Sequence, residues 1–265
     1  MEPRSFGARL RQWRRTRRMS QEQLAAQAEV STRHLSFVET GRSMPSRTMV
    51  LVLASALDLP LRERNLLLHA AGYAAVYRET ALGCDAASPL RRTLALMLRH
   101  QEPYPALGVT PFWDLVDLNQ AALRVFGHFL DGPLAASAAG NVLHQLFHPD
   151  GLRRFVVNWE SVAEHLLARL RREVLLEPEP SGHLALWEAL QQYPDVAAPV
   201  DPGPCAPAPD PWLALHLKRD GLELRLFTTL TTLGTPLDVT AEELRIETYF
   251  PADAATDAWL RAACC

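Results

Sequence analysis

Apolar side chains in the first seventy residues recur every three or four positions, the spacing of a helix that buries one face. This spacing predicts five short helices, which start near residues 5, 20, 32, 46 and 61. In the first of them, Phe6, Leu10 and Trp13 form the apolar stripe. Together, five such helices can enclose a small core.

The segment 20–39 reads as a helix, a tight turn and a second helix. Ser20 and Gln23 have the spacing of a capping box, in which each side chain bonds the backbone amide of the other residue. Ser31 is positioned to cap the second helix, and Gly41 to end it in a left-handed conformation. Two helices joined in this way are typical of the helix-turn-helix motif.

From Pro89 onward the pattern mixes helices and strands. Helical spacing predicts helices over 90–98, after Asn119, and over 141–148, 152–176, 183–193 and 254–263. Alternating apolar and polar residues predict strands over 106–110, 113–118, 212–219, 222–230 and 244–250. Asp220-Gly221 fits a tight hairpin turn, and seven prolines make 194–211 a loop.

These elements predict an α+β protein of two domains with an antiparallel sheet in the second. We expect a helical domain over 1–74, a linker over 75–88 and the sheet-containing domain over 89–265. A length of 265 residues, of which 48% are hydrophobic, suffices for two cores.

The distribution of charge also distinguishes the first part of the chain from the rest. Residues 1–50 hold ten arginines against four acidic residues, whereas the remainder holds 17 basic and 26 acidic groups. The overall net charge of −3 hides this asymmetry, which is expected when one end of a protein meets phosphate and the other does not.

The composition also bears on location. The start of the chain lacks the apolar stretch of a signal peptide, and no apolar run approaches the ~20 residues that a membrane span needs. The four cysteines have no metal-binding spacing. We therefore expect a cytoplasmic protein with free thiols and no membrane partner.

The segment SQEQLAAQAEVSTRHLSFVETGR, from Ser20 to Arg42, resembles the Cro/phage-repressor (XRE) type of helix-turn-helix. This resemblance implies a five-helix, lambda-repressor-like DNA-binding domain that binds a double-stranded operator as a homodimer. It also implies a set of DNA-contacting residues: Gln21, Thr32, Arg33, Ser36, Phe37, Arg42 and Arg47.

Physical reasoning gives each of these residues a role. Gln21 lies at a helix start, which suits a phosphate, and Arg33 can donate to a guanine in the major groove. Phe37 either touches a thymine methyl group or packs, while Arg42 and Arg47 contact the backbone or the minor groove. A second group of arginines forms either a solvated face or flanking phosphate contacts: Arg14, Arg15, Arg17 and Arg18.

The second half resembles the MmyB-like regulator ligand-binding domain, which has a PAS-like fold. Three segments carry the resemblance: PFWDLVDLNQAALRVFG, FHPDGLRRFVVNWESVAEHLLARLRRE and LFTTLTTLGTPLDVTAEELRIETYFPADAAT. The proline-rich loop 194–211 departs from the family pattern, so its role stays open. The family implies a sensor of a small, apolar, fatty-acid-like ligand.

Aromatic and polar side chains on converging elements are candidates for that ligand site, because such pockets are mostly apolar with a few polar anchors. The candidates are Trp113, Phe147, Asn158, Trp159, Phe227, Thr229 and Phe250. The alternative for the aromatic residues is an ordinary core, and Asn119 is better explained as a helix cap.

No catalytic pattern accompanies these features. His144 and His148 share a helix face, but no HExxH pattern or third ligand follows, and glycines do not cluster into a phosphate loop. We expect no enzyme activity, no metal and no cofactor. Two alternatives remain beside the ligand-responsive regulator: a constitutive repressor whose second domain only dimerises, and an enzyme with a DNA-binding head.

Overall fold

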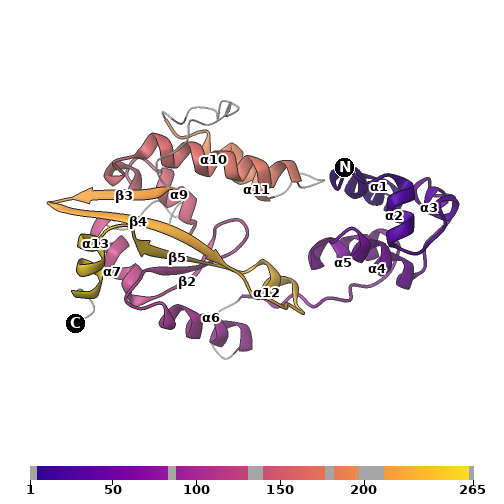
Figure 1. The fold of residues 1–265 in the computed structure, drawn as a ribbon, viewed down its shortest axis with the longest axis horizontal. Helices are drawn as coiled ribbons and strands as arrows, with labels where there is room; N and C mark the ends of the chain where they lie inside the picture. The colour runs from indigo at the N-terminus through magenta and orange to yellow at the C-terminus, as the bar shows by residue number, and fades with distance from the viewer. Residues whose placement is uncertain are drawn as a thin grey trace. The chain divides into compact units, whose positions relative to one another are not determined.

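The computed structural model describes residues 5–82, 88–130, 140–176, 182–194, 196 and 212–262, and its chain forms two units (Figure 1). Unit 1 comprises the chain up to Ala81 together with Leu233–Glu242. Unit 2 comprises Leu82–Thr232 and the chain from Glu243 onward. The predicted α+β fold with a helical first part is confirmed.

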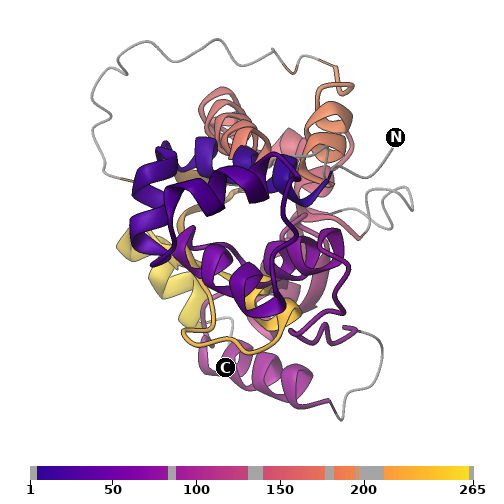
Figure 2. The same cartoon turned by 90° about the vertical axis from the view of Figure 1, so that its right-hand side faces the viewer.

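Unit 1 contains the five predicted helices: α1 (Phe6–Thr16), α2 (Gln21–Gln27), α3 (Thr32–Glu39), α4 (Arg47–Ala56) and α5 (Leu61–Ala70). Figure 2 shows them, in indigo to violet, around a common interior. The stripe of Phe6, Leu10 and Trp13 is buried there. Ser20, with its capping box, and Ser31 cap α2 and α3 as predicted.

Gly7 lets α1 approach the end of α3 closely. A Cβ atom at this position would lie 2.5 Å from the carbonyl oxygen of Glu39 and 2.6 Å from that of Val38. No side chain fits at that distance, so a glycine is required. The contact fixes where the end of α3 lies on the core of unit 1.

Unit 2 is built on an antiparallel sheet with the strand order β2-β1-β5-β4-β3. Its strands are β1 (Ala106–Val109), β2 (Leu115–Leu118), β3 (Ala214–Arg219), β4 (Leu222–Thr231) and β5 (Arg245–Pro251). Asp220 and Gly221 form the predicted hairpin turn, both with positive φ. β5 is central because it pairs with both β1 and β4.

Helices cover both faces of this sheet. They are α6 (Pro89–His100), α7 (Gln120–Phe129), α9 (Val142–Phe147), α10 (Trp159–Leu176), α11 (Gly182–Leu190) and α13 (Ala254–Ala262), with the 3₁₀ helix η1 (Leu152–Phe155). Leu94 and Leu98 of α6 pack against Ala106 and Ile246 on one face. The larger core, with α7, α9, α10 and α11, covers the other (Figure 1).

Two predicted elements differ from the structure in their boundaries. The helix predicted over 152–176 is broken into η1 and α10, because Val156 bridges to Leu217 of β3 in between. Trp113, expected in a strand, has a φ of 67°, and β2 starts two residues later. Most of the loop 194–211 lies outside the described residues.

The domain limits also differ from those expected. Residues 75–81, assigned to a linker, belong to unit 1, where Asn65 of α5 binds the backbone of Tyr77 through its amide. Leu233–Glu242, expected in the second domain, belongs to unit 1 as well and carries most of the short helix α12 (Val239–Glu243).

Candidate DNA-binding surface and ligand cavity

The outer face of α3 is open to solvent. Thr32 and Arg33 are exposed, and Ser36 and Phe37 are half-buried. On the opposite face, Leu35 and Val38 are buried in the core, together with the side chain of Glu39. The helix therefore presents the side that the sequence predicted, at the position of the second helix of a helix-turn-helix.

Two arginines lie over one aromatic ring at this surface. The guanidinium carbon of Arg33 lies 5.4 Å from the centroid of the Phe37 ring, and that of Arg42 lies 6.0 Å from it. Cations are attracted to the face of an aromatic ring at such distances. Of the two explanations of Phe37, packing therefore has direct structural support, and the residues packed on it are arginines.

The buried carboxylate of Glu39, at the end of α3, binds side chains from α1 and α2. Its carboxylate accepts two hydrogen bonds from Arg14, at 2.7 and 2.9 Å, and one from the amide of Gln21 at 2.8 Å. Arg11 donates to its backbone carbonyl at 3.0 Å. Burial alone raises the pKa of Glu39, but these hydrogen bonds and positive charges outweigh it and hold the pKa below its usual value.

Several predicted phosphate-binding side chains thus have partners inside unit 1. Gln21 bonds Glu39, and Arg14 does the same with 11% of its side chain exposed. Arg17 donates to the carbonyls of Leu57 and Asp58 at the end of α4. A solvated face does not describe Arg14, whereas Arg17 is exposed even though it makes these two bonds. Four more of the predicted arginines are exposed as well: Arg15, Arg18, Arg42 and Arg47.

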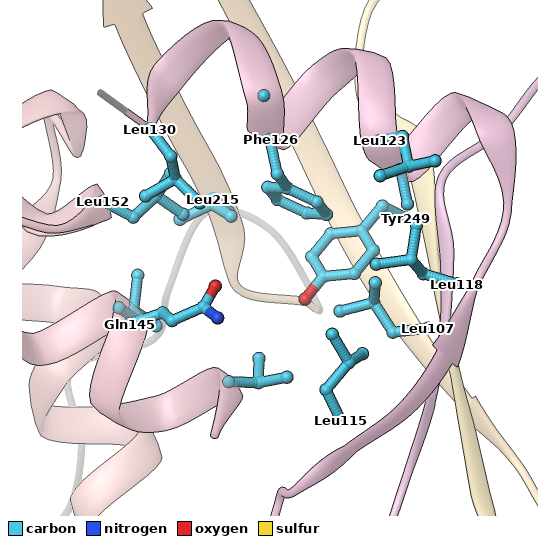
Figure 3. Close-up of a pocket in the computed structure, with 14 residues that line it drawn as sticks. Leu107, Leu115, Leu118, Leu123, Phe126, Leu130, Gln145, Leu152, Leu215 and Tyr249 are labelled. Carbon is cyan, nitrogen blue, oxygen red and sulfur yellow. The ribbon is translucent and has the colours of Figure 1, made fainter. Parts of the chain in front are cut away.

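Unit 2 contains an apolar cavity of about 260 Å³ on the sheet face covered by α7 and α9 (Figure 3). Leucines from both strands and helices supply most of its wall. The lining residues are Leu107, Leu115, Leu118, Ala122, Leu123, Phe126, Gly127, Leu130, Val142, Gln145, Leu146, Leu152, Leu215 and Tyr249. The cavity is thus mostly apolar with few polar groups, as small-molecule sites are.

Gln145 and Tyr249 bring polar atoms to this cavity, and Figure 3 shows the amide and the hydroxyl pointing toward each other. The Tyr249 hydroxyl donates to the carboxylate of Glu247 at 2.7 Å, two residues earlier on β5. Burial raises the pKa of Glu247 to about 6, although the Tyr249 hydrogen bond and the charge of Arg169 pull it down. Burial and the carboxylate raise the pKa of Tyr249 well above its usual value.

None of the seven predicted ligand residues lines this cavity, so that prediction is wrong for it. Trp113 and Phe147 are buried core residues, and Trp159 packs edge-on against Phe147 with ring centroids 4.9 Å apart. The Asn158 side chain donates to the Ala214 carbonyl at 2.6 Å and accepts from the His216 amide at 3.0 Å, which braces β3.

The other three predicted residues lie on the opposite side of the sheet. Phe227 is paired with Phe250, and Thr229 with Thr248, across β4 and β5. Since successive side chains of a strand alternate between faces, Phe250 and Thr248 point away from the face of Tyr249. The sequence carried one signal close to this cavity, namely an acidic residue inside an apolar strand at Glu247, which accepts from the Tyr249 hydroxyl.

The surroundings of His144 indicate a structural role for the pair His144 and His148. His144 Nδ1 lies 2.8 Å from the Tyr193 hydroxyl, and burial, with a smaller effect of His148, lowers the pKa of His144 despite the charge of Asp114. Asn119 caps α7 as expected, accepting from the Ala122 amide at 2.9 Å. Across the described ranges, no three potential ligands gather into a metal site.

No helix in the described part of the chain is long and apolar enough to cross a bilayer. The structure thus defines a class of protein with a helix-turn-helix unit and a second, cavity-containing α+β unit. Comparison with protein families agrees. Residues 5–67 match a helix-turn-helix domain, and residues 90–263 match the MmyB-like transcription regulator ligand binding domain.

The second match covers more than half of the chain, and the chain belongs to the MmyB-like transcription regulators. It is a DNA-binding transcription regulator with a ligand-binding domain. No curated protein matches it. Among solved structures, an RNA-binding Light-Oxygen-Voltage receptor aligns over 97% of this chain with 11% identity and a TM-score of 0.27. The chain spans 62% of the length of that receptor.

Proposed function

We propose that a small, mostly apolar ligand binds the cavity of unit 2 and changes the affinity of the regulator for its operator. The observation that carries this proposal is the leucine-lined cavity of about 260 Å³ between the sheet and α7. A well-packed core without a void would favour a domain that only dimerises. An apolar cavity of this size gains free energy when an apolar molecule fills it.

We also propose that α3 enters the major groove of the operator. Thr32, Arg33 and Ser36 are then positioned for base edges, and Arg42 and Arg47 for phosphates. The exposure of Arg33, Arg42 and Arg47 supports this assignment. Gln21 would share its amide between Glu39 and a phosphate at the start of α2.

Control of DNA binding requires two arrangements of the regulator with different affinities for the ligand. We propose a homodimer on a near-dyadic operator, acting in the cytoplasm, in which the ligand changes the relative placement of the two helix-turn-helix units. The symmetry of such operators is the physical reason to expect two copies, since each α3 reads one half-site.

The test is an operator-binding titration with and without ligand. The operator is selected from random duplexes with the purified full-length protein, and affinity is measured by fluorescence anisotropy. We expect at least one compound from a panel of medium-chain alcohols, ethers and carboxylic acids to change the operator affinity by about fivefold or more.

A cavity-filling variant provides the control. Leu115→Phe adds volume inside the cavity and should abolish the response, whereas Leu115→Met conserves volume and should keep it. An operator affinity that no compound changes, in the wild type as in both variants, would reject ligand control and leave a constitutive DNA-binding protein.

A further inference from the structure

We propose that the ligand of this cavity has a neutral head group that donates a hydrogen bond, as an alcohol does, and that the site discriminates against ionised carboxylates. This inference rests on the proposed function, because it concerns the chemistry of the same ligand. It arises from the pair formed by Tyr249 and Glu247, of which only Tyr249 lines the cavity.

Tyr249 has one hydroxyl proton, and its hydrogen bond to Glu247 uses that proton. The hydroxyl oxygen lies 2.7 Å from Oε2 of Glu247, and a carboxylate can only accept. Toward the cavity the hydroxyl then offers lone pairs alone. A ligand group that meets it must bring its own proton, which an alcohol can do and an ether or carboxylate cannot.

Glu247 keeps this arrangement fixed at neutral and higher pH. Its pKa of about 6 leaves it ionised there, while Tyr249 stays protonated. Among nearby charges, Arg169 attracts it from α10, and Arg245, on the same strand, bonds Glu173 at 3.0 Å instead. His183 faces the same Glu173 at 3.5 Å. A second negative charge at the Tyr249 hydroxyl would lie close to the carboxylate of Glu247, with little water to screen it.

Gln145 does not reverse this preference. Its amide faces the Tyr249 hydroxyl from α9 (Figure 3), and an amide both donates and accepts hydrogen bonds. A neutral amide brings no positive charge for a carboxylate. The remaining lining side chains are apolar.

The volume sets the length of the ligand. A dry cavity of about 150 Å³ holds benzene, so at the same packing about 260 Å³ takes roughly ten non-hydrogen atoms. Two isomers of that size, 1-nonanol and 1-methoxyoctane, differ only in whether the oxygen carries a proton. Octanoate has the same number of non-hydrogen atoms and carries a charge.

The experiment is calorimetric titration of the full-length protein with these three compounds at pH 8, where octanoate and Glu247 are both ionised. We expect 1-nonanol to bind about tenfold more tightly than 1-methoxyoctane, the size of one unmatched polar contact, and at least as much more tightly than octanoate.

Two variants test whether Tyr249 and Glu247 cause the preference for the alcohol. Tyr249→Phe removes the acceptor and should bring the preference of 1-nonanol over its ether isomer close to one. Glu247→Gln removes the negative charge beside the hydroxyl, so octanoate should gain severalfold relative to 1-nonanol. The control is Tyr104→Phe, which removes a hydroxyl bonded to Asp257 outside the cavity and should leave all ratios unchanged.

The outcomes separate this inference from the proposed function. Octanoate or the ether binding wild-type protein as tightly as 1-nonanol overturns the head-group inference while ligand binding stands. In folded variants, a preference over the ether that survives Tyr249→Phe, or one over octanoate that survives Glu247→Gln undiminished, overturns it too. If none of the three compounds binds and none changes operator affinity, the proposed function itself fails.

Discussion

Glu39 and Glu247 are both buried, yet their contributions to stability depend on pH with opposite sign. The pKa of Glu39 lies below its ordinary value of 4.5, because its hydrogen-bonding partners outweigh burial. Its contribution is therefore present above pH 4.5 and lost as the pH falls through the pKa of the folded state. The pKa of Glu247 is raised to about 6, so unit 2 loses stability as the pH rises from 4.5 to 6.

Removing the Glu39 carboxylate should destabilise unit 1 strongly. Glu39→Ala leaves the largely buried Arg14 without its partner, which costs about 3 kcal/mol for a buried ion pair. Hydrogen exchange of the unit 1 amides at pH 7 measures the loss. The difference from wild type should shrink as the pH falls below 4.5 and through the lowered pKa of Glu39, because the wild-type carboxylate then loses its charge.

Glu22→Ala, an exposed change in the first turn of α2, is the control and should alter exchange by less than about 0.5 kcal/mol. The double variant Arg14→Met with Glu39→Met should recover much of the loss, because replacing both members of a buried pair is often neutral. A double variant as unstable as the sum of the single ones would show that packing, not the ion pair, matters here.

At the scale of the element, α3 and the turn that follows it are expected to make two kinds of DNA contact, through Arg33 and Arg42 respectively. Arg33→Ala should weaken binding to the selected operator by about 1–3 kcal/mol and relax the preference at one base pair. Arg42→Ala should weaken binding to all sequences evenly and flatten the dependence of affinity on salt. Anisotropy titrations at several salt concentrations, on the operator and on single-base variants, measure both effects.

If Arg33→Ala weakens every sequence equally, Arg33 contacts phosphate, and the assignment of a base contact is wrong. The contact of both arginines with the Phe37 ring adds a matched check. Phe37→Leu keeps an apolar side chain of similar size but removes the ring face. It should therefore weaken both kinds of contact modestly.

Most helices and strands could be predicted from the sequence, because periodicity and caps are local signals. Ser20, Ser31, Ser46 and Asn119 each accept a hydrogen bond at the helix start they mark. The break between η1 and α10 was not visible, because its cause is the distant strand β3. The helix α12 is too short for its apolar period to be read.

The outward face of α3 was predicted better than the lining of the cavity for a physical reason. The outward face of α3 follows from helical period and caps alone. The cavity depends on which side of a strand faces the helices, and one step along β5 separates Tyr249, which lines it, from Phe250, which does not. Large aromatic residues filled the core instead, and leucines were left to line the space.

At the scale of the whole molecule, Leu233–Glu242 connects two strands of unit 2 but belongs to unit 1. Asp238 accepts from the Thr80 hydroxyl at 2.7 Å, and Glu242 accepts from the Leu61 amide at 2.7 Å. The Val239 amide donates to the Arg78 carbonyl at 2.9 Å. β5, which carries Tyr249, begins three residues after Glu242, so this segment joins the cavity wall to unit 1 through the chain itself.

Weakening the attachment of Leu233–Glu242 to unit 1 should reduce the effect of the ligand on operator affinity. It should change the ligand affinity and the ligand-free operator affinity less. Asp238→Ala removes the Thr80 bond and the side-chain bond to the Ala241 amide, a loss of about 1–2 kcal/mol. We expect the ligand-induced change in operator affinity to fall by half or more. Ligand affinity and ligand-free operator affinity should change less than about twofold.

Thr80→Val should reproduce the effect in part, and Glu160→Ala, an exposed change in α10, should not. Anisotropy titrations with and without ligand measure all three variants. Undiminished control in both Asp238→Ala and Thr80→Val would exclude this segment as the route of communication.

The same segment limits how the regulator can be recombined with others. A chimera that transplants residues 1–82 onto a foreign sensor would leave behind the acceptors that Thr80 and Leu61 use. To transfer the DNA-binding unit of this regulator intact, both residues 1–82 and Leu233–Glu242 must be transferred together. Chimeras joined at a single junction should be less stable, even where each parent protein is stable.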